Sequence, residues 1–138
     1  MTNNLKKTKY KILFVCIENS CRSQIAEALA FIYGKDIIEP YSAGSNPLGQ
    51  VNPKAIASMQ RMNYDMKNHY SKSLDEIPDI EYHFAITMGC GDVCPNTKAH
   101  KRMDWAITDP KAMNPQKFDE IRDLIKEKIL HLIKTITP

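Results

Sequence analysis

Short runs of β-branched and aromatic residues alternate along this 138-residue chain with stretches in which apolar residues recur every three or four positions. The first pattern is typical of buried strands and the second of amphipathic helices. We predict strands over residues 9–15, 37–42 and 82–88, and helical segments over residues 25–34, 52–63 and 118–136. Strands that alternate with helices predict an α/β fold in which a parallel sheet is covered on both faces.

The helix signals differ in strength. Asn52 can cap the second helix and Pro53 suits a first helical position. The last helix has the clearest apolar stripe: Phe118, Ile121, Ile125, Ile129, Leu132 and Ile136. The polar stretch 63–78 allows one short helix, and residues 90–114 have few periodic apolar positions, so we expect a long functional loop there. No repeat or second-domain boundary is visible, so we expect one domain over residues 1–138.

Composition narrows the class of protein. The net charge of +3 arises from 19 basic and 16 acidic residues spread along the chain, an excess too small to indicate nucleic-acid binding. The longest apolar run near the start, residues 12–17, is much shorter than the roughly 20 residues that cross a bilayer. We therefore expect a cytoplasmic protein without a membrane partner.

Four cysteines, at positions 16, 21, 90 and 94, need an explanation in such a chain. The cytosol keeps structural disulfides reduced, so these residues are expected to be thiols. Free cysteine is also a common small core residue. The neighbours of each cysteine must therefore show whether it packs in the core or has a chemical function. Cys16 and Cys90 each follow a predicted strand. Ligands of parallel sheets bind at that edge, where the carboxyl ends of strands meet helix amino ends.

The segment from Cys16 to Arg22 joins the first strand to the first helix. Its backbone N–H groups can converge on an anion at the positive helix end, and the same field would depress the pKa of Cys16. Arg22 can direct two N–H donors to oxyanion oxygens. We therefore predict a nucleophilic Cys16 thiolate, with Ser23 hydrogen-bonding its sulfur and Asn19 fixing the loop. The predicted oxyanion-binding residues are Ile17, Glu18, Asn19, Ser20, Cys21 and Arg22. Loop capping is the alternative role of Asn19 and Ser23.

This loop, together with the Asp109-Pro110 pair and the predicted sheet, resembles the low-molecular-weight protein tyrosine phosphatase family over nearly the whole chain. The resemblance implies a three-layer sandwich with a four-stranded parallel sheet and helices on both faces. It also implies that Asp109 is the general acid that protonates the leaving oxygen. A turn or helix cap before proline is the alternative role for Asp109.

Within this superfamily the chain is more similar to thioredoxin-coupled arsenate reductases, which share the Asn19–Gln24 segment and the following Ala26-Glu27 pair. The phosphatases usually carry proline at the position of Gln24 and an aromatic residue at that of Lys111. The resemblance therefore implies reduction of arsenate to arsenite, and phosphate-monoester hydrolysis through a phosphocysteine is the alternative. The oxyanion partner is arsenate or phosphate, and we expect a monomer.

Cys90 and Cys94 distinguish the two activities, because only a reduction needs two electrons from thiols. The resemblance implies that Cys90 attacks the Cys16 adduct and that Cys94 then moves the disulfide to a Cys90–Cys94 pair. Thioredoxin or another thiol reductant would reduce this pair. The last two cysteines are closer together here than in well-known relatives, although a bent five-residue segment can bring their Cα atoms within disulfide range.

The remaining hypotheses concern bound metals and a protein without catalytic activity. Some arsenate reductases bind potassium through residues matched here by Asn19, Glu27 and Ser42, which makes potassium a candidate cofactor. Tyr70 and Lys72 alter other positions of that site. A structural zinc at Cys90, Cys94 and His100, completed by Cys16 or His83, is a rival hypothesis, but it leaves the Cys16 loop unexplained. A regulator that binds an anion without turnover is a second rival. We expect no tightly bound metal.

Overall fold

The computed structural model describes residues 8–89 and 97–137. Four strands form one parallel sheet in the order β2-β1-β3-β4, with bounds Ile38–Ala43, Tyr10–Val15, Tyr82–Thr87 and Ala99–Asp104. The helices are α1 (Arg22–Tyr33), α2 (Pro53–Gln60) and α3 (Pro115–Ile136), with a short 3-10 helix, η1 (Leu74–Glu76). The predicted α/β three-layer fold with a four-stranded parallel sheet is confirmed.

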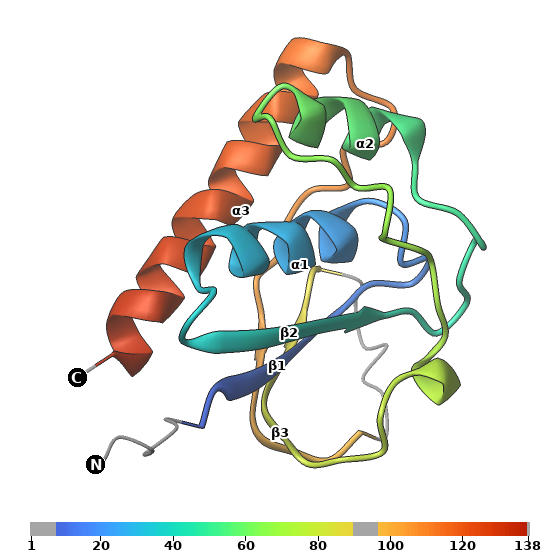
Figure 1. The fold of residues 1–138 in the computed structure, drawn as a ribbon. Coiled ribbons are helices and arrows are strands. Elements are labelled where there is room, and N and C mark those ends of the chain that lie inside the picture. The colour runs from blue at the N-terminus through green and yellow to red at the C-terminus, as the bar shows by residue number, and fades with distance from the viewer. Residues whose placement is uncertain (1–7, 90–96, 138) are drawn as a thin grey trace.

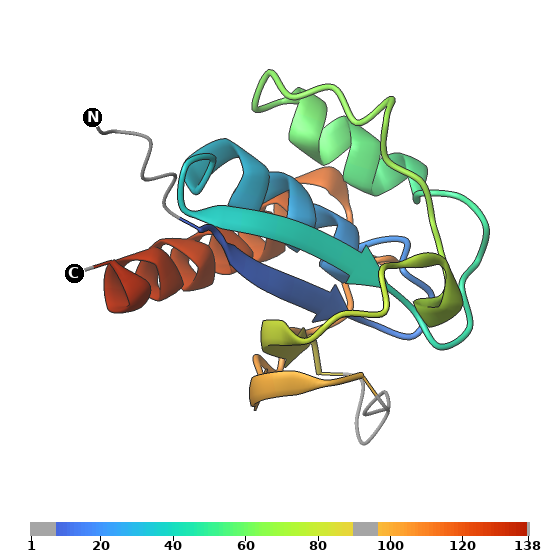
Figure 2. The ribbon, with the colours of Figure 1, turned by 60° about the horizontal axis from the view of Figure 1, so that its bottom comes forward.

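The two faces of the sheet have separate apolar layers because side chains alternate along each strand. Ile12 and Phe14 of β1 belong to the large core that the helices complete, whereas Leu13 and Val15 pack on the other face with Ile77, next to η1. Figures 1 and 2 show α1 and α3 side by side over the first face, with α2 near the amino-terminal part of α3. The second face is covered by the segment that carries η1.

The helices lie close to the predicted segments, although α1 and α3 each begin three residues earlier than predicted, at Arg22 and Pro115. Asn52 and Asn114 cap α2 and α3 by accepting hydrogen bonds from the backbone N–H groups of Lys54 and Lys117. The apolar stripe of α3 provides four fully or nearly buried residues, which are Phe118, Ile125, Ile129 and Leu132. The helix α2 ends at Gln60, slightly earlier than predicted, and a turn continues to Asn63, whose φ is 63°.

One prediction was wrong. Part of the expected loop 90–114 is strand β4, Ala99–Asp104, which pairs with β3 along the edge of the sheet. Its sequence, AHKRMD, is mostly exposed and lacks the apolar alternation by which strands are recognised. An edge strand rich in charged side chains is a common arrangement because it prevents further pairing.

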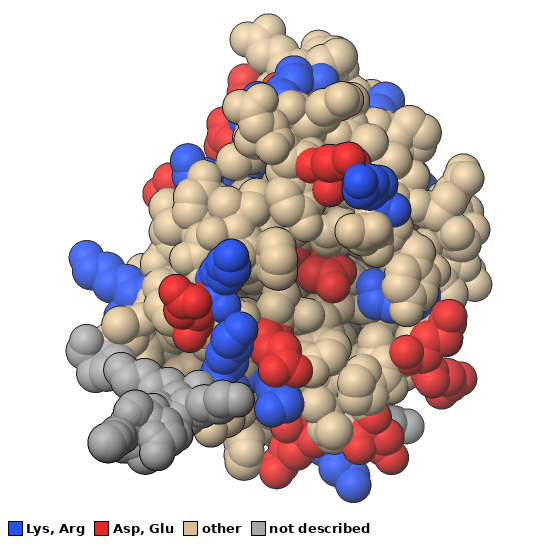
Figure 3. Space-filling model, viewed as in Figure 1, with Lys and Arg blue, Asp and Glu red and all other residues tan. Residues whose placement is uncertain are grey.

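The outer surface is mixed in charge. On the face seen in Figure 3, basic and acidic side chains are interspersed rather than gathered by sign. Within the described ranges, no helix is both long enough and apolar enough to cross a membrane.

Candidate active site

Strand β1 delivers Cys16 to the carboxyl edge of the sheet, and helix α1 begins six residues later at Arg22. The intervening loop is held from outside through its carbonyl oxygens. The Ile17 oxygen accepts from the Asn46 N–H at 2.8 Å, the Glu18 oxygen from the Leu48 N–H at 3.0 Å, and the Ser20 oxygen from the Asn52 N–H at 3.0 Å. In a trans peptide the N–H points opposite to the carbonyl, so the N–H groups that follow these oxygens are turned toward the inside of the loop.

Gly44, just after β2, allows this close packing. A Cβ atom at this position would lie 2.5 Å from the Ile17 oxygen and 2.8 Å from the Cys16 oxygen. The Gly44 N–H donates to the Lys72 carbonyl at 3.0 Å. The loop therefore rests directly on backbone, which fixes its shape without any side chain at position 44.

The Cys16 sulfur lies 2.9 Å from the Ser23 hydroxyl oxygen, and both residues are buried. The Asn19 side-chain amide donates to the same Ser23 oxygen at 2.8 Å. Because this amide uses a lone pair of the oxygen, the hydroxyl hydrogen can be donated to the sulfur. Ser23 is thus placed to stabilise an anionic sulfur, which is the arrangement expected of a nucleophilic thiolate.

Asn19 is fully buried and has a left-handed backbone, with φ of 49°. Its side-chain oxygen accepts from the Gln24 amide at 2.8 Å and from the Lys72 N–H at 2.9 Å. Gln24 also donates to the Tyr70 carbonyl at 2.8 Å. Asn19 therefore connects the loop to helix α1 and to the segment around Lys72, rather than to solvent.

Arg22 joins the loop to the ends of two other elements. Its Nη1 donates to the carbonyl oxygens of Met88 and Ile107, each at 2.8 Å. Both hydrogens on Nη1 are therefore used, and the hydrogens on Nη2 and Nε are left to contact an anion. The Nη2 atom lies 3.9 Å from the Asp109 Oδ2, and the Arg22 side chain is only 12% exposed.

A pocket of about 130 Å³ opens above the sulfur and brings most of the predicted site together. Its lining residues are Cys16, Ile17, Glu18, Ser20, Cys21, Arg22, Asp109 and Lys111. Ser23 and Asn19 lie behind this lining. At the rim, Lys111 Nζ is 3.6 Å from Glu18 Oε1, and both side chains are substantially exposed. The pocket thus combines a sulfur, a guanidinium and a carboxyl group within a volume that suits a small oxyanion.

Asp109 lies on the segment that follows β4. The Lys111 N–H donates to Asp109 Oδ1 at 3.1 Å, which forms a local turn across Pro110. The Asp109 side chain is 41% exposed and lines the pocket. Both expected roles of Asp109, as a turn residue and as a proton donor, are therefore compatible with its position.

Asp104, at the end of β4, was not predicted as a site residue. Its carboxylate accepts from the Thr87 hydroxyl at 2.6 Å, the Gly89 N–H at 2.8 Å and the Ala106 N–H at 3.1 Å. The hydrogen bond from Thr87, supported by those from the two N–H groups, holds the pKa of Asp104 below its ordinary value. Asp104 therefore fixes the carboxyl end of β3, whose Met88 carbonyl receives Arg22. Asp104 was not recognised from the sequence because strand β4, which ends at this residue, was predicted as a loop.

Cys90 and Cys94 lie outside the described residues. Gly89, which precedes Cys90, has φ of +88° and packs against the backbone of Ile107. The zinc hypothesis also involved His83 and His100, which lie at the amino ends of β3 and β4 with ring centroids 5.8 Å apart. Since the strands are parallel and six residues long, these rings are at the opposite edge of the sheet from Cys16. Among the described residues, no group of three or more metal-ligating side chains is present.

The family described as low molecular weight phosphotyrosine protein phosphatase matches residues 11–138. The chain belongs to this family. An arsenate reductase of Bacillus cereus is 36% identical to it over 132 residues, which cover 94% of this chain and 98% of that relative. The resemblance inferred from the loop and the Asp-Pro pair is thereby confirmed.

Solved structures give the same picture. An arsenate reductase in a phosphate-binding state superposes with a TM-score of 0.84 at 32% identity and covers 93% of this chain and 99% of its own. A thioredoxin-dependent arsenate reductase of Corynebacterium glutamicum has a TM-score of 0.73 at 30% identity and covers 96% of this chain and 64% of its own. Arsenate reductases with solved structures therefore share the fold of this chain.

Proposed function

We propose that this chain reduces arsenate to arsenite, using Cys16 as nucleophile and thioredoxin or another thiol as the final reductant. The observation that carries the proposal is the small pocket in which the Cys16 sulfur, the free donors of Arg22 and the Asp109 carboxyl group face one space. The curated relatives named as arsenate reductases, at 36–37% identity over most of the chain, favour this oxyanion. The cysteine pair at positions 90 and 94 supplies the thiols that a reduction needs.

In the first step, the Cys16 thiolate attacks arsenic and forms a sulfur–arsenic bond. One arsenic–oxygen bond breaks, and Asp109 donates a proton so that the oxygen leaves as water. Arg22 binds the remaining oxygens through Nη2 and Nε, while Nη1 stays on the carbonyls of Met88 and Ile107. The guanidinium is therefore oriented before the anion arrives.

In the second step, the Cys90 thiolate attacks the Cys16 sulfur. A Cys16–Cys90 disulfide forms, and the electron pair of the broken sulfur–arsenic bond remains on arsenic, which leaves as arsenite. Cys94 then attacks Cys90 and releases the Cys16 thiolate, and the external thiol reduces the Cys90–Cys94 disulfide. Two thiols supply the two electrons in each cycle.

A phosphatase is the second candidate, because the same pocket would accept phosphate and water would resolve a phosphocysteine. The rim argues against an aryl ester. Lys111 occupies the position after Pro110 and pairs with Glu18, so the pocket entrance carries charged side chains in place of an aromatic surface.

The decisive experiment compares Cys90→Ser and Cys94→Ser with the wild type in two assays, arsenate reduction with a thioredoxin system and hydrolysis of a small aryl phosphate. Both variants should lose multiple-turnover reduction and keep any slow hydrolysis, whereas Cys16→Ser should lose both activities. After a single addition of arsenate, mass spectrometry should find a Cys16–Cys90 disulfide in Cys94→Ser. Full steady-state reduction by both variants would remove the relay and favour the phosphatase.

A further inference from the structure

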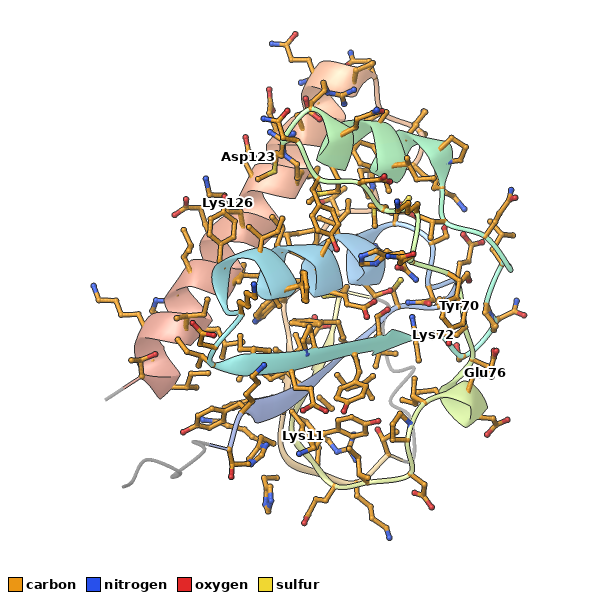
Figure 4. The ribbon with its side chains drawn as sticks, viewed as in Figure 1. Lys11, Tyr70, Lys72, Glu76, Asp123 and Lys126 are labelled. Carbon is orange, nitrogen blue, oxygen red and sulfur yellow. The ribbon has the colours of Figure 1, made fainter. Side chains whose placement is uncertain are left out.

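A buried lysine lies behind the Cys16 loop. Lys72 is 7% exposed, and its ammonium nitrogen is 3.1 Å from the Tyr70 carbonyl oxygen and 3.2 Å from the Ser42 hydroxyl oxygen. The Glu27 carboxylate lies 3.6 Å away, and the Tyr70 ring centroid 4.8 Å away. Figure 4 shows Lys72 and Tyr70 beside the carboxyl end of β2. Helix α1, strand β2 and the segment 70–72 thus converge on one ammonium group.

Lysine is rarely buried unless its charge is paired and hydrogen-bonded, and here it is both. The nearby His69 is 3.8 Å from Glu27, but burial lowers the pKa of His69, so its ring is neutral at pH 7. The Ser42 hydroxyl donates to Glu27 at 2.6 Å. Lys72 is therefore the cation that balances Glu27 in this cluster.

A carboxylate, a hydroxyl and a carbonyl oxygen around one positive charge are also the ligands that a hard monovalent cation takes. The residues that resemble a potassium site, namely Asn19, Glu27 and Ser42, are present here, but they do not fit an added ion. The Asn19 side-chain oxygen already accepts two hydrogen bonds, from the Gln24 side-chain amide and from the backbone N–H of Lys72, so both of its lone pairs are used. Glu27 and Ser42 already contact the ammonium group, which would repel a second cation.

This cluster is connected to the nucleophile by a continuous set of contacts. The Lys72 N–H donates to Asn19, the Asn19 amide donates to Ser23, and Ser23 lies 2.9 Å from the Cys16 sulfur. On the other side, the Lys72 carbonyl accepts from Gly44, against which the loop packs. The position of Lys72 therefore influences the Cys16 loop from two directions.

We propose that the Lys72 ammonium is a built-in cation, which takes the place of a potassium ion between Glu27, Ser42 and Tyr70. Lys72 is in this sense a positioning residue: it holds the Cys16 loop in its anion-binding shape and makes that shape independent of monovalent cations. It contacts neither the pocket nor the reacting sulfur.

The wild type gives the first test without any substitution. A ligand that binds the native state raises its stability by mass action, so a potassium-binding chain would melt at a higher temperature in KCl than in NaCl of equal ionic strength. We expect identical melting temperatures in the two salts. A reproducibly higher melting temperature in KCl would overturn the proposal.

The second test is Lys72→Ala, which leaves room for an ion and an unbalanced Glu27. In NaCl, its melting temperature should fall by about 5 °C or more, and KCl or NH₄Cl should restore part of this loss. Alkylation of Cys16 by iodoacetamide, followed by peptide mass spectrometry, should slow by about fivefold in NaCl, the equivalent of one lost hydrogen bond, and should recover in KCl. A merely structural lysine would show no such preference between salts.

The matched control is Lys35→Ala, because Lys35 is exposed and lies after α1. It should behave as the wild type in all salts. If Lys72→Ala does not fold, the double substitution Lys72→Met with Glu27→Gln removes both charges and should fold without a salt preference. Equal melting and alkylation in Lys72→Ala and Lys35→Ala would refute the positioning role. Neither readout uses arsenate, so the result does not depend on the proposed activity.

Discussion

Replacing Arg22 with lysine tests whether oxyanion binding in the pocket needs the paired N–H donors of a guanidinium or only a positive charge. One nitrogen of Arg22, Nη1, holds the carbonyl oxygens of Met88 and Ile107, and the others face the pocket. Lysine has a single nitrogen on a flexible stem. That nitrogen cannot satisfy two carbonyl groups and also present two donors to an oxyanion.

The magnitude follows from these contacts. Loss of one oxyanion donor costs about 10²–10³ in kcat, and Arg22→Lys removes the paired contact, so we expect kcat/KM for arsenate to fall by about 10³ or more. A hydrogen bond from a charged group to a carbonyl contributes about 1.5–3 kcal/mol, and lysine can keep at most one of the two. The melting temperature should therefore fall by about 5–10 °C.

The assay is single-turnover reduction of arsenate, quantified as arsenite released, together with thermal melting. The matched control is Arg61→Lys, because the exposed Arg61 guanidinium binds Asp119 through two nitrogens and does not line the pocket. That control should lose little stability and no activity. If Arg22→Lys retained kcat/KM within about threefold of the wild type, less than 1 kcal/mol, the assignment of the loop would be incorrect.

Two further substitutions test the support of the loop. Gly44→Ala places a Cβ 2.5 Å from the Ile17 oxygen and should destabilise the chain by about 1–3 kcal/mol in urea unfolding, with loss of activity. Gly49→Ala is the comparison: its Cβ meets no atom within 4 Å, but its φ of +98° strains alanine, so it should lose some stability and keep its activity. Equal activity in both variants would contradict the packing argument. Asp104→Asn tests a lowered pKa: the carboxylate contributes stability above its unfolded pKa, near 3.8, and loses it as pH falls through the lower folded value. The stability gap between wild type and Asp104→Asn should thus be constant near pH 7 and shrink below about pH 4, and a gap that grew on acidification would exclude the assigned hydrogen bonds.

The sequence predicted the parts of the site that are local. Cys16, Asn19, Arg22 and Ser23 lie within eight residues between a clear strand and a clear helix, so their spacing already determines their geometry. The same is true of α2, whose asparagine cap and proline start are recognised from neighbouring positions, and of the apolar stripe of α3. Short-range patterns carry this information because the backbone conformations involved span only a few residues.

The missed features depend on distant segments. Strand β4 is exposed on an edge, so burial imposes no alternation on its side chains, and only pairing with β3 reveals it. Asp104 becomes important because that pairing places it beside Thr87 and Gly89. Lys72 was named from the resemblance as an altered position of the potassium site, but its burial was not predicted. A lysine in a polar stretch normally indicates an exposed side chain, and only the folded chain shows its ammonium group beside Glu27 and Ser42.

Cys16 and Cys21 lie on the same loop in different environments, and this difference supports the proposal that Cys16 is the nucleophile. Cys21 lines the same pocket as Cys16, but burial, followed by the charge of Asp109, raises the pKa of Cys21 to about 12. At neutral pH it is a protonated thiol. Cys16 differs because a hydroxyl group, that of Ser23, is held 2.9 Å from its sulfur by the buried Asn19 amide. In the proposed mechanism, an incoming oxyanion therefore meets the Cys16 sulfur as its nucleophile, and the neutral Cys21 thiol only lines the pocket.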